Sequence, residues 1–165
     1  MADYRGMVLA VAEYDNEHRG YFEAAYDHRL VVKQCDDCAL LRWEPGAACP
    51  WCMSMHWHWQ QVSGRGTIYS YQIVCQAIQA GFRDWTPYPI VLVELDEQRG
   101  RPTPDEALRM VMNLVDGSFR PENEANVAIG KRVEVIFQEI DGGFTLPQWR
   151  LTADQPADGL WQLPE

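Results

Sequence analysis

Basic residues are scarce in this sequence. It has 14 Lys and Arg against 24 Asp and Glu among 165 residues, which gives a formal net charge of −10 at pH 7. Binding to a phosphate backbone or to an anionic membrane surface needs clustered Lys and Arg, and an acidic chain is repelled by both. We therefore expect this chain to bind neither nucleic acid nor a membrane.

Long apolar runs are also missing, because no stretch approaches the roughly 20 residues that a membrane-spanning helix needs. The apolar stretch at residues 6–12 is short and is flanked by acidic residues, unlike a secretory signal. We therefore expect reduced cysteines and a cytoplasmic protein. Hydrophobic residues still make up 47% of the chain, which is enough for the core of one domain or of one small domain with an appendage.

A catalytic motif is missing as well. We find no nucleophile paired with a general base in a recognised pattern, and Cys75 has no histidine near it in the sequence. Cys75 falls at the end of an expected strand, so we predict a buried thiol there. The chain on its own is therefore not expected to turn over a substrate.

The sequence does contain two close pairs of cysteines, Cys35 with Cys38 and Cys49 with Cys52, separated by ten residues. Two residues between cysteines let both thiolates turn toward one ion, and a second pair completes a tetrahedral site. This layout is typical of a rubredoxin-like zinc ribbon. We predict one structural Zn²⁺ on these four cysteines, because four thiolates leave no position for water or substrate. Losing one ligand should loosen the ribbon and affect the rest of the chain less.

Three other interpretations of these cysteines stay open. One pair alone could be a thioredoxin-like redox motif, but that motif needs a βαβ context that is not recognisable here. Two disulfides would need an oxidising compartment, for which we see no secretory segment. Iron in a rubredoxin-like site is the alternative metal.

A helix is predicted from Asn16, whose side chain can cap its first turn. Tyr21, Phe22, Ala25 and Tyr26 fall on one face of this helix, opposite a charged face. The aromatic face either packs inside the chain or contacts a partner, and the sequence favours neither.

The remaining pattern is that of β-strands. Two strands are predicted in the ribbon, at residues 30–34 and 40–43, and His56 to Trp59 alternate as a further strand with Trp57 and Trp59 on one face. Five strands follow, at residues 62–75, 88–95, 108–115, 132–137 and 144–151.

The first of these five strands is long and carries Gly64 and Gly66, which suggests a coiled first strand of an OB-type Greek-key barrel, although strand spacing alone does not distinguish it from another small barrel. We therefore predict a mainly β chain with four parts. These are an N-terminal segment with the helix at 1–28, the zinc ribbon at 29–61, the OB-fold barrel at 62–153 and a loose acidic tail at 154–165.

A polar loop between the first two barrel strands carries Phe82, Arg83 and Trp85. Aromatic residues and Arg are the side chains that most often anchor interfaces, and on an open loop they would otherwise be left in water. The predicted partner-binding residues are therefore Tyr21, Phe22, Tyr26, Phe82, Arg83 and Trp85.

Several ordered motifs resemble a known family. They are Arg29 and Leu30, Cys35 and Cys38, Pro45, Cys49-Pro50-Trp51-Cys52, and residues 62–71, 87–95, 129–137 and 146–150. This pattern, which covers about residues 16–151, resembles the acyl-CoA-associated family called domain of unknown function 35, whose members join a zinc ribbon to an OB fold. The chain departs from this pattern at residues 98–106, where relatives usually connect the two strands by a shorter loop. A partner contact at this loop can therefore differ from that of the family.

The resemblance implies a small accessory subunit of thiolase-like enzymes, including acyltransferases, thiolases and the lipid-transfer-type aldolases that cleave steroid side chains. It further implies docking on a thiolase-fold dimer with two copies of each subunit, and acyl-CoA at the shared interface. The alternative function is an OB-fold protein that binds single-stranded nucleic acid, in which Tyr69 and Tyr71 would stack on bases. The net charge opposes that alternative.

Overall fold

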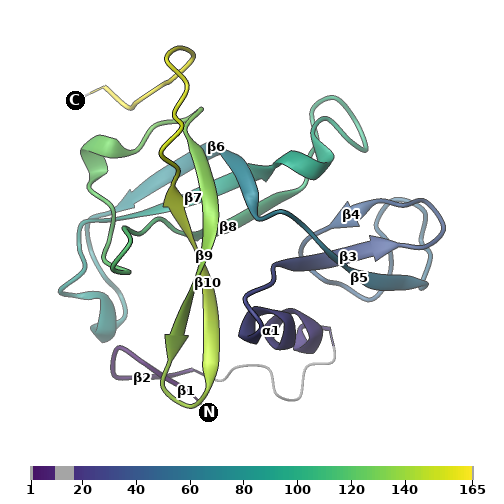
Figure 1. The fold of residues 1–165 in the computed structure, drawn as a ribbon, viewed down its shortest axis with the longest axis horizontal. Coiled ribbons are helices and arrows are strands. Elements are labelled where there is room, and N and C mark those ends of the chain that lie inside the picture. The colour runs from purple at the N-terminus through teal and green to yellow at the C-terminus, as the bar shows by residue number, and fades with distance from the viewer. Residues whose placement is uncertain (1, 10–16, 165) are drawn as a thin grey trace.

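The computed structural model describes residues 2–9 and 17–164, and its regular structure is mainly β (Figure 1). A short hairpin is followed by one α-helix, a three-stranded ribbon and a five-stranded barrel. The predicted fold class is therefore confirmed. No helix among the described residues combines the length and the apolar character needed to cross a membrane.

The barrel has the OB topology. Its strands are β6 (Arg65–Val74), β7 (Tyr88–Leu95), β8 (Arg109–Asn113), β9 (Arg132–Ile140) and β10 (Phe144–Leu151), arranged in the order β10-β9-β6-β7-β8. A register shift between Ile68 and Ser70 bends β6, which pairs with β9 at its start and with β7 along its length. The sheet closes where Leu114 pairs in parallel with Trp149.

The ribbon is a separate sheet in the order β4-β3-β5. Its strands are β3 (Val31–Cys35), β4 (Leu41–Arg42) and β5 (Trp57–Gln61). Trp57 and Trp59 are half-buried on one face of β5 while His58 is exposed on the other, as the alternation predicted.

One hydrophobic core runs through both sheets. Val32 and Leu41 of the ribbon belong to the same buried cluster as Val91, Val93 and Trp149 of the barrel. The helix α1 (Arg19–Tyr26) contributes Tyr21 to this cluster and lies against both β3 and β10 (Figure 1). It begins at Arg19, and the predicted cap Asn16 lies outside the described residues.

Three short 3-10 helices punctuate the loops: η1 (Ala80–Phe82), η2 (Asp96–Gln98) and η3 (Glu124–Asn126). Each residue of η2 contacts a different part of the chain, so we call Asp96, Glu97 and Gln98 the η2 clamp. The side chain of Gln98 accepts from the Leu41 backbone N–H at 2.8 Å and donates to the Leu41 carbonyl at 2.7 Å, as a neighbouring strand would. Glu97 accepts from the backbone N–H of Ser63.

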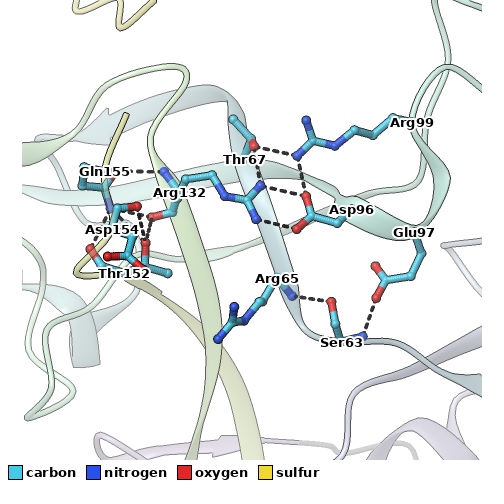
Figure 2. Close-up of polar contacts among 10 residues, drawn as sticks. All are labelled: Ser63, Arg65, Thr67, Asp96, Glu97, Arg99, Arg132, Thr152, Asp154 and Gln155. Carbon is cyan, nitrogen blue, oxygen red and sulfur yellow. Dashed lines mark hydrogen bonds and ion pairs between the residues drawn. The ribbon is translucent and has the colours of Figure 1, made fainter. Parts of the chain in front are cut away.

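Asp96 connects the η2 clamp to β9 through an ion pair with Arg132. Figure 2 shows Arg132 and Arg99 converging on its carboxylate, and Arg132 Nη1 lies 2.7 Å from Asp96 Oδ1. The main chain of Arg132 is in turn held by Gln155, whose side-chain oxygen accepts from its N–H at 2.9 Å and whose side-chain nitrogen donates to its carbonyl at 2.8 Å. The η2 clamp thus ties the ribbon, the barrel and the C-terminal segment together.

Arg132 lowers the pKa of Asp96 to about 2, chiefly by donating hydrogen bonds to its carboxylate. The unfolded value is about 3.9, so the stabilisation by this pair is present above about pH 4 and is lost as the pH falls through 2. Replacing Arg132 with glutamine is expected to raise the Asp96 pKa. An NMR titration of the carboxyl carbon measures both values, and an Asp96 that titrates near 4 in the unmodified chain would contradict this assignment.

The N-terminal hairpin was not predicted, because residues 1–15 show little periodicity. Strands β1 (Ala2–Tyr4) and β2 (Met7–Leu9) pair around a turn at Arg5 and Gly6, both with positive φ. Tyr4 is buried, and its hydroxyl donates to Gln138 of β9 at 3.4 Å. Long-range contacts of this kind leave no signal in a three-residue strand.

The prediction of a loose C-terminal tail is wrong for the residues that the structure describes. Trp161 pairs with Ile129 through two backbone hydrogen bonds of 2.8 and 3.1 Å. Gln162 donates to two carbonyls beside η3, and the Leu163 N–H donates to the Tyr71 hydroxyl at 2.7 Å. The tail therefore lies on the barrel instead of extending into solvent.

Candidate metal centre

The four paired cysteines converge at the end of the ribbon. All four sulfur atoms lie within 4.8 Å of one another, with Cys35 to Cys52 at 3.5 Å and Cys38 to Cys49 at 3.7 Å. Tetrahedral zinc with Zn–S bonds of about 2.3 Å separates its sulfurs by about 3.8 Å, whereas a disulfide would join two of them at about 2.0 Å. The arrangement fits a metal ion and not two disulfides.

Two knuckles with the same backbone geometry present these sulfurs. In the first, the Cys35 N–H donates to the Leu40 carbonyl and the Ala39 N–H donates to the Cys35 carbonyl, both at 2.9 Å. The second knuckle repeats this pattern. Its Cys49 N–H donates to the Ser54 carbonyl at 2.8 Å, and its Met53 N–H donates to the Cys49 carbonyl at 2.9 Å. Ala39 and Met53, which follow the second cysteine of each pair, both adopt positive φ.

The four thiols fall into two groups. A backbone hydrogen bond from Cys38 lowers the pKa of Cys35 to about 6, and backbone hydrogen bonds also lower that of Cys49. Burial and contacts with the other sulfurs raise the pKa values of Cys38 and Cys52. The thiolate is the form that binds a metal, so the fold favours that form at Cys35 and Cys49. When bound, zinc would cross-link β3, the first knuckle and the second knuckle, and its closed set of four ligands would leave no position for a substrate.

Two buried cations hold the loop that leads to the second knuckle. Lys33 is fully buried; its Nζ lies 3.6 Å from the centre of the Trp57 ring and donates to the Gly46 carbonyl at 3.2 Å. It also pairs with Glu17, just before the helix. The Arg42 guanidinium donates to the carbonyls of Gly46 at 2.7 Å and of Ala48 at 2.6 Å. These contacts fix the approach of Cys49 to the other ligands.

Ala39 offers a test of the knuckle geometry. Its φ of +59° is the left-handed conformation that costs an L-residue about 1–2 kcal/mol, a penalty that glycine avoids. Ala39→Gly is therefore expected to raise the free energy of unfolding by up to about 1 kcal/mol, measured by denaturant titration of the zinc-loaded chain. Ala47→Gly, in the same ribbon at ordinary φ, is the matched control and should not stabilise.

The predicted partner residues on the helix differ in how far the structure buries them. Tyr21 is buried and packs on the Trp43 ring at 4.6 Å, so it belongs to the core. Phe22 is half-buried against the same cluster, whereas Tyr26 is 67% exposed. The helix thus offers Tyr26 to a partner but not the full aromatic face.

The loop at residues 76–86 differs more from its prediction. Trp85 is only 4% exposed, and Phe82 is half-buried beside it. The guanidinium of Arg5 lies 4.3 Å from the Trp85 ring and pairs with Asp84 at 2.6 Å. The expectation that these aromatics are left in water is therefore wrong, because the N-terminal hairpin covers them. Arg83 is exposed, as expected.

Cys75 also departs from its prediction. It lies just past the end of β6 and is exposed, not buried, and its sulfur is 3.9 Å from the Ile73 carbonyl. His56 and His58 are exposed beside the ribbon, where His58 Nδ1 lies 2.6 Å from an Asp36 oxygen. Both histidines lie outside the set of four sulfurs that could hold a metal.

Sequence reasoning missed the η2 clamp and the burial of Lys33. Gln98 falls in a polar loop of the sequence, and no pattern distinguishes a glutamine that pairs with a distant strand. Lys33 lies at the centre of β3, where the alternation cannot reveal that two tryptophans and Glu17 enclose it. The aromatic residues of β5 were the available signal, since a buried cation needs such neighbours.

Two family models match this chain. Residues 22–54 match the rubredoxin-like zinc ribbon domain of ChsH2, and residues 59–138 match the C-terminal OB-fold domain of ChsH2. Among curated proteins, a probable enoyl-CoA hydratase alpha subunit from Thermomonospora curvata is 35% identical over 135 residues. That match covers 82% of this chain but only 37% of the relative.

Solved structures give the same fold. The structure of an aldolase described as Ltp2-ChsH2(DUF35) contains a chain that is 32% identical, with a TM-score of 0.69 and coverage of 86% of this chain and 98% of that one. A protein of unknown function from the DUF35 family of Sulfolobus solfataricus is 13% identical with a TM-score of 0.54, and covers 86% of this chain and 90% of its own. The second likeness concerns the fold alone.

Proposed function

Since the chain belongs to the domain of unknown function 35 family, with the zinc ribbon and C-terminal OB fold of the ChsH2 type, we propose that it is an accessory subunit of an acyl-CoA enzyme. The observation that carries this proposal is the likeness to the DUF35 chain of the Ltp2-ChsH2 aldolase over 98% of that chain. The partner supplies the catalytic groups, and this chain supplies a rigid surface for assembly.

The finer part of the proposal concerns the partner. A thiolase-fold or lipid-transfer-type enzyme fits the aldolase relative, and the family pattern adds two copies of each subunit with acyl-CoA at the shared interface. A hydratase is the other class of partner, because the Thermomonospora relative carries that description. This chain spans 37% of that relative's length, so its activity is carried over only as a class of partner. Steroid side chains are one substrate class for such aldolases.

Features of the described residues agree with a non-catalytic role. Four of the five cysteines are placed to bind metal, and the fifth, Cys75, is exposed with its sulfur near a carbonyl. The nucleic-acid alternative is less well supported. The guanidinium of Arg109 lies 3.6 Å from the Tyr69 ring and pairs with Glu94, while the Tyr71 hydroxyl is engaged by the tail. One face of the Tyr69 ring is therefore covered by a guanidinium within the chain, and Tyr71 is held by the tail through its hydroxyl.

The test is co-expression with thiolase-fold acyl-CoA enzymes from the same source, followed by size-exclusion chromatography and an assay of acyl-CoA turnover. The two chains are expected to co-elute, and the isolated chain is expected to be inactive. Robust turnover by the isolated chain would overturn the accessory role. Tight, salt-sensitive binding of an oligonucleotide would favour the alternative function instead.

A further inference from the structure

The second knuckle carries large apolar side chains in water. Trp51 is 56% exposed, Met53 73% and Met55 61%, and Pro50 is exposed beside them. We call these four residues the apolar knuckle. The turn that presents them is fixed by its backbone hydrogen bonds and by two metal ligands, so little conformational freedom remains to be lost on binding.

The first knuckle serves as an internal comparison. The two turns share one hydrogen-bond pattern, yet the positions of Trp51 and Met53 are held by Asp37 and Ala39 in the first knuckle. The metal site therefore does not require apolar residues there. Met53 also has a φ of +64°, a conformation that costs about 1–2 kcal/mol for an L-residue. Because Ala39 has the same positive φ in the first knuckle, this conformation belongs to the turn, and the exposed side chain of Met53 is what points to a function other than folding.

A cleft continues this surface. Trp51 lines it from the ribbon together with Leu40 and Trp43, and Pro102 and Leu108 line it from the barrel side. Arg101 lines the adjoining cleft beside Cys38. An exposed aromatic anchor beside a cleft is the arrangement found at the energetic centre of protein interfaces.

The charge around the apolar knuckle indicates what can cover it. Asp36 and Asp37 are exposed on the neighbouring turn, beside His58 and His56. The chain as a whole carries a formal net charge of −10, so this surface is expected to repel nucleic acid and anionic lipid. Its complement is a protein surface with an apolar depression ringed by Lys or Arg.

We propose that the apolar knuckle docks on the catalytic partner subunit, on a patch with an apolar centre and a basic rim. This inference rests on the proposed function and adds the surface that makes the contact. In this proposal the tryptophan that anchors the partner is the exposed Trp51, and not Trp85, which the sequence predicted and the N-terminal hairpin covers.

The experiment gives the second knuckle the two side chains that the first knuckle has at the equivalent positions. The double variant Trp51→Asp/Met53→Ala copies the residues of an equivalent turn, so zinc content and thermal stability should not fall. Its Kd for the purified acyl-CoA enzyme that co-elutes with the unmodified chain should rise roughly 30-fold or more, as for the loss of an anchor. Val8→Asp, at an exposed position of the N-terminal hairpin, is the matched control and should bind as the unmodified chain does.

A second readout is photo-cross-linking from p-benzoylphenylalanine at position 51, with position 37 as its counterpart on the first knuckle. Cross-links to the partner should be several-fold stronger from position 51. A double variant that binds with unchanged Kd, or equal cross-linking from both positions, overturns the docking site while the proposed function stands. An unmodified chain that fails to bind the enzyme overturns both.

Discussion

Replacing Cys49 with serine is expected to release the metal and to destabilise the whole chain. Cys49 is fully buried and supplies one of the four sulfurs, so three ligands and a hydroxyl would remain. Structural zinc binds zinc-finger peptides with about 10–16 kcal/mol of apparent free energy, which is comparable to the entire stability of a domain at about 5–15 kcal/mol. Elemental analysis measures the loss of zinc, and thermal unfolding followed by circular dichroism measures the loss of stability.

The spread of this effect beyond the ribbon follows from the shared core. Val32 and Leu41 of the ribbon pack in one cluster with the barrel, so a loosened ribbon uncovers barrel residues. The sequence alone predicts a smaller effect on the barrel. Cys75→Ser is the control, and at this exposed position it should keep one zinc and change stability by no more than about 0.5 kcal/mol. Full zinc retention by Cys49→Ser, or two disulfides found by mass spectrometry, would contradict the metal assignment.

Replacing Gln98 with alanine is expected to cost about 2–4 kcal/mol of unfolding free energy. Its amide satisfies both the N–H and the carbonyl of Leu41 in a site where Gln98 is 3% exposed. A buried backbone group without a partner costs about 1–3 kcal/mol, and two are affected here. Denaturant titration measures the change, and Gln72→Ala on the exposed side of β6 should remain within about 0.5 kcal/mol.

Gln98→Glu separates the hydrogen bonds from the packing. At neutral pH the introduced carboxylate can still accept from the Leu41 N–H, but it repels the Leu41 carbonyl to which the glutamine donates. The protonated acid can donate to that carbonyl, so the Gln98→Glu variant should gain stability relative to the unmodified chain as the pH falls toward 5. A variant with no such pH dependence would show that packing, and not the paired hydrogen bonds, holds Gln98.

The sequence predicted the elements whose signals are local. The cysteine spacing led to the metal centre, and alternation located β7 and β10 at residues 88–95 and 144–151, as observed. These succeeded because a knuckle and a half-buried strand each follow a short rule. The family pattern then supplied the OB topology.

What the sequence could not predict depends on distant contacts. Trp85 was expected on the surface because nothing in its loop shows that Arg5 lies over it. The tail looked loose because its anchoring hydrogen bonds go to Tyr71 and to residues beside η3. Gln98 acts as a strand partner for Leu41 across more than fifty residues, and a side chain that replaces a backbone neighbour has no periodicity.

Native mass spectrometry of the chain co-purified with a thiolase-fold acyl-CoA enzyme from the same source tests whether it is an accessory subunit. One spectrum reports whether a complex forms, its stoichiometry and its metal content. We expect a species whose mass equals the partner plus copies of this 19.0 kDa chain, each with one zinc ion. A chain that appears only by itself, with or without zinc, would contradict the proposal that it is an accessory subunit.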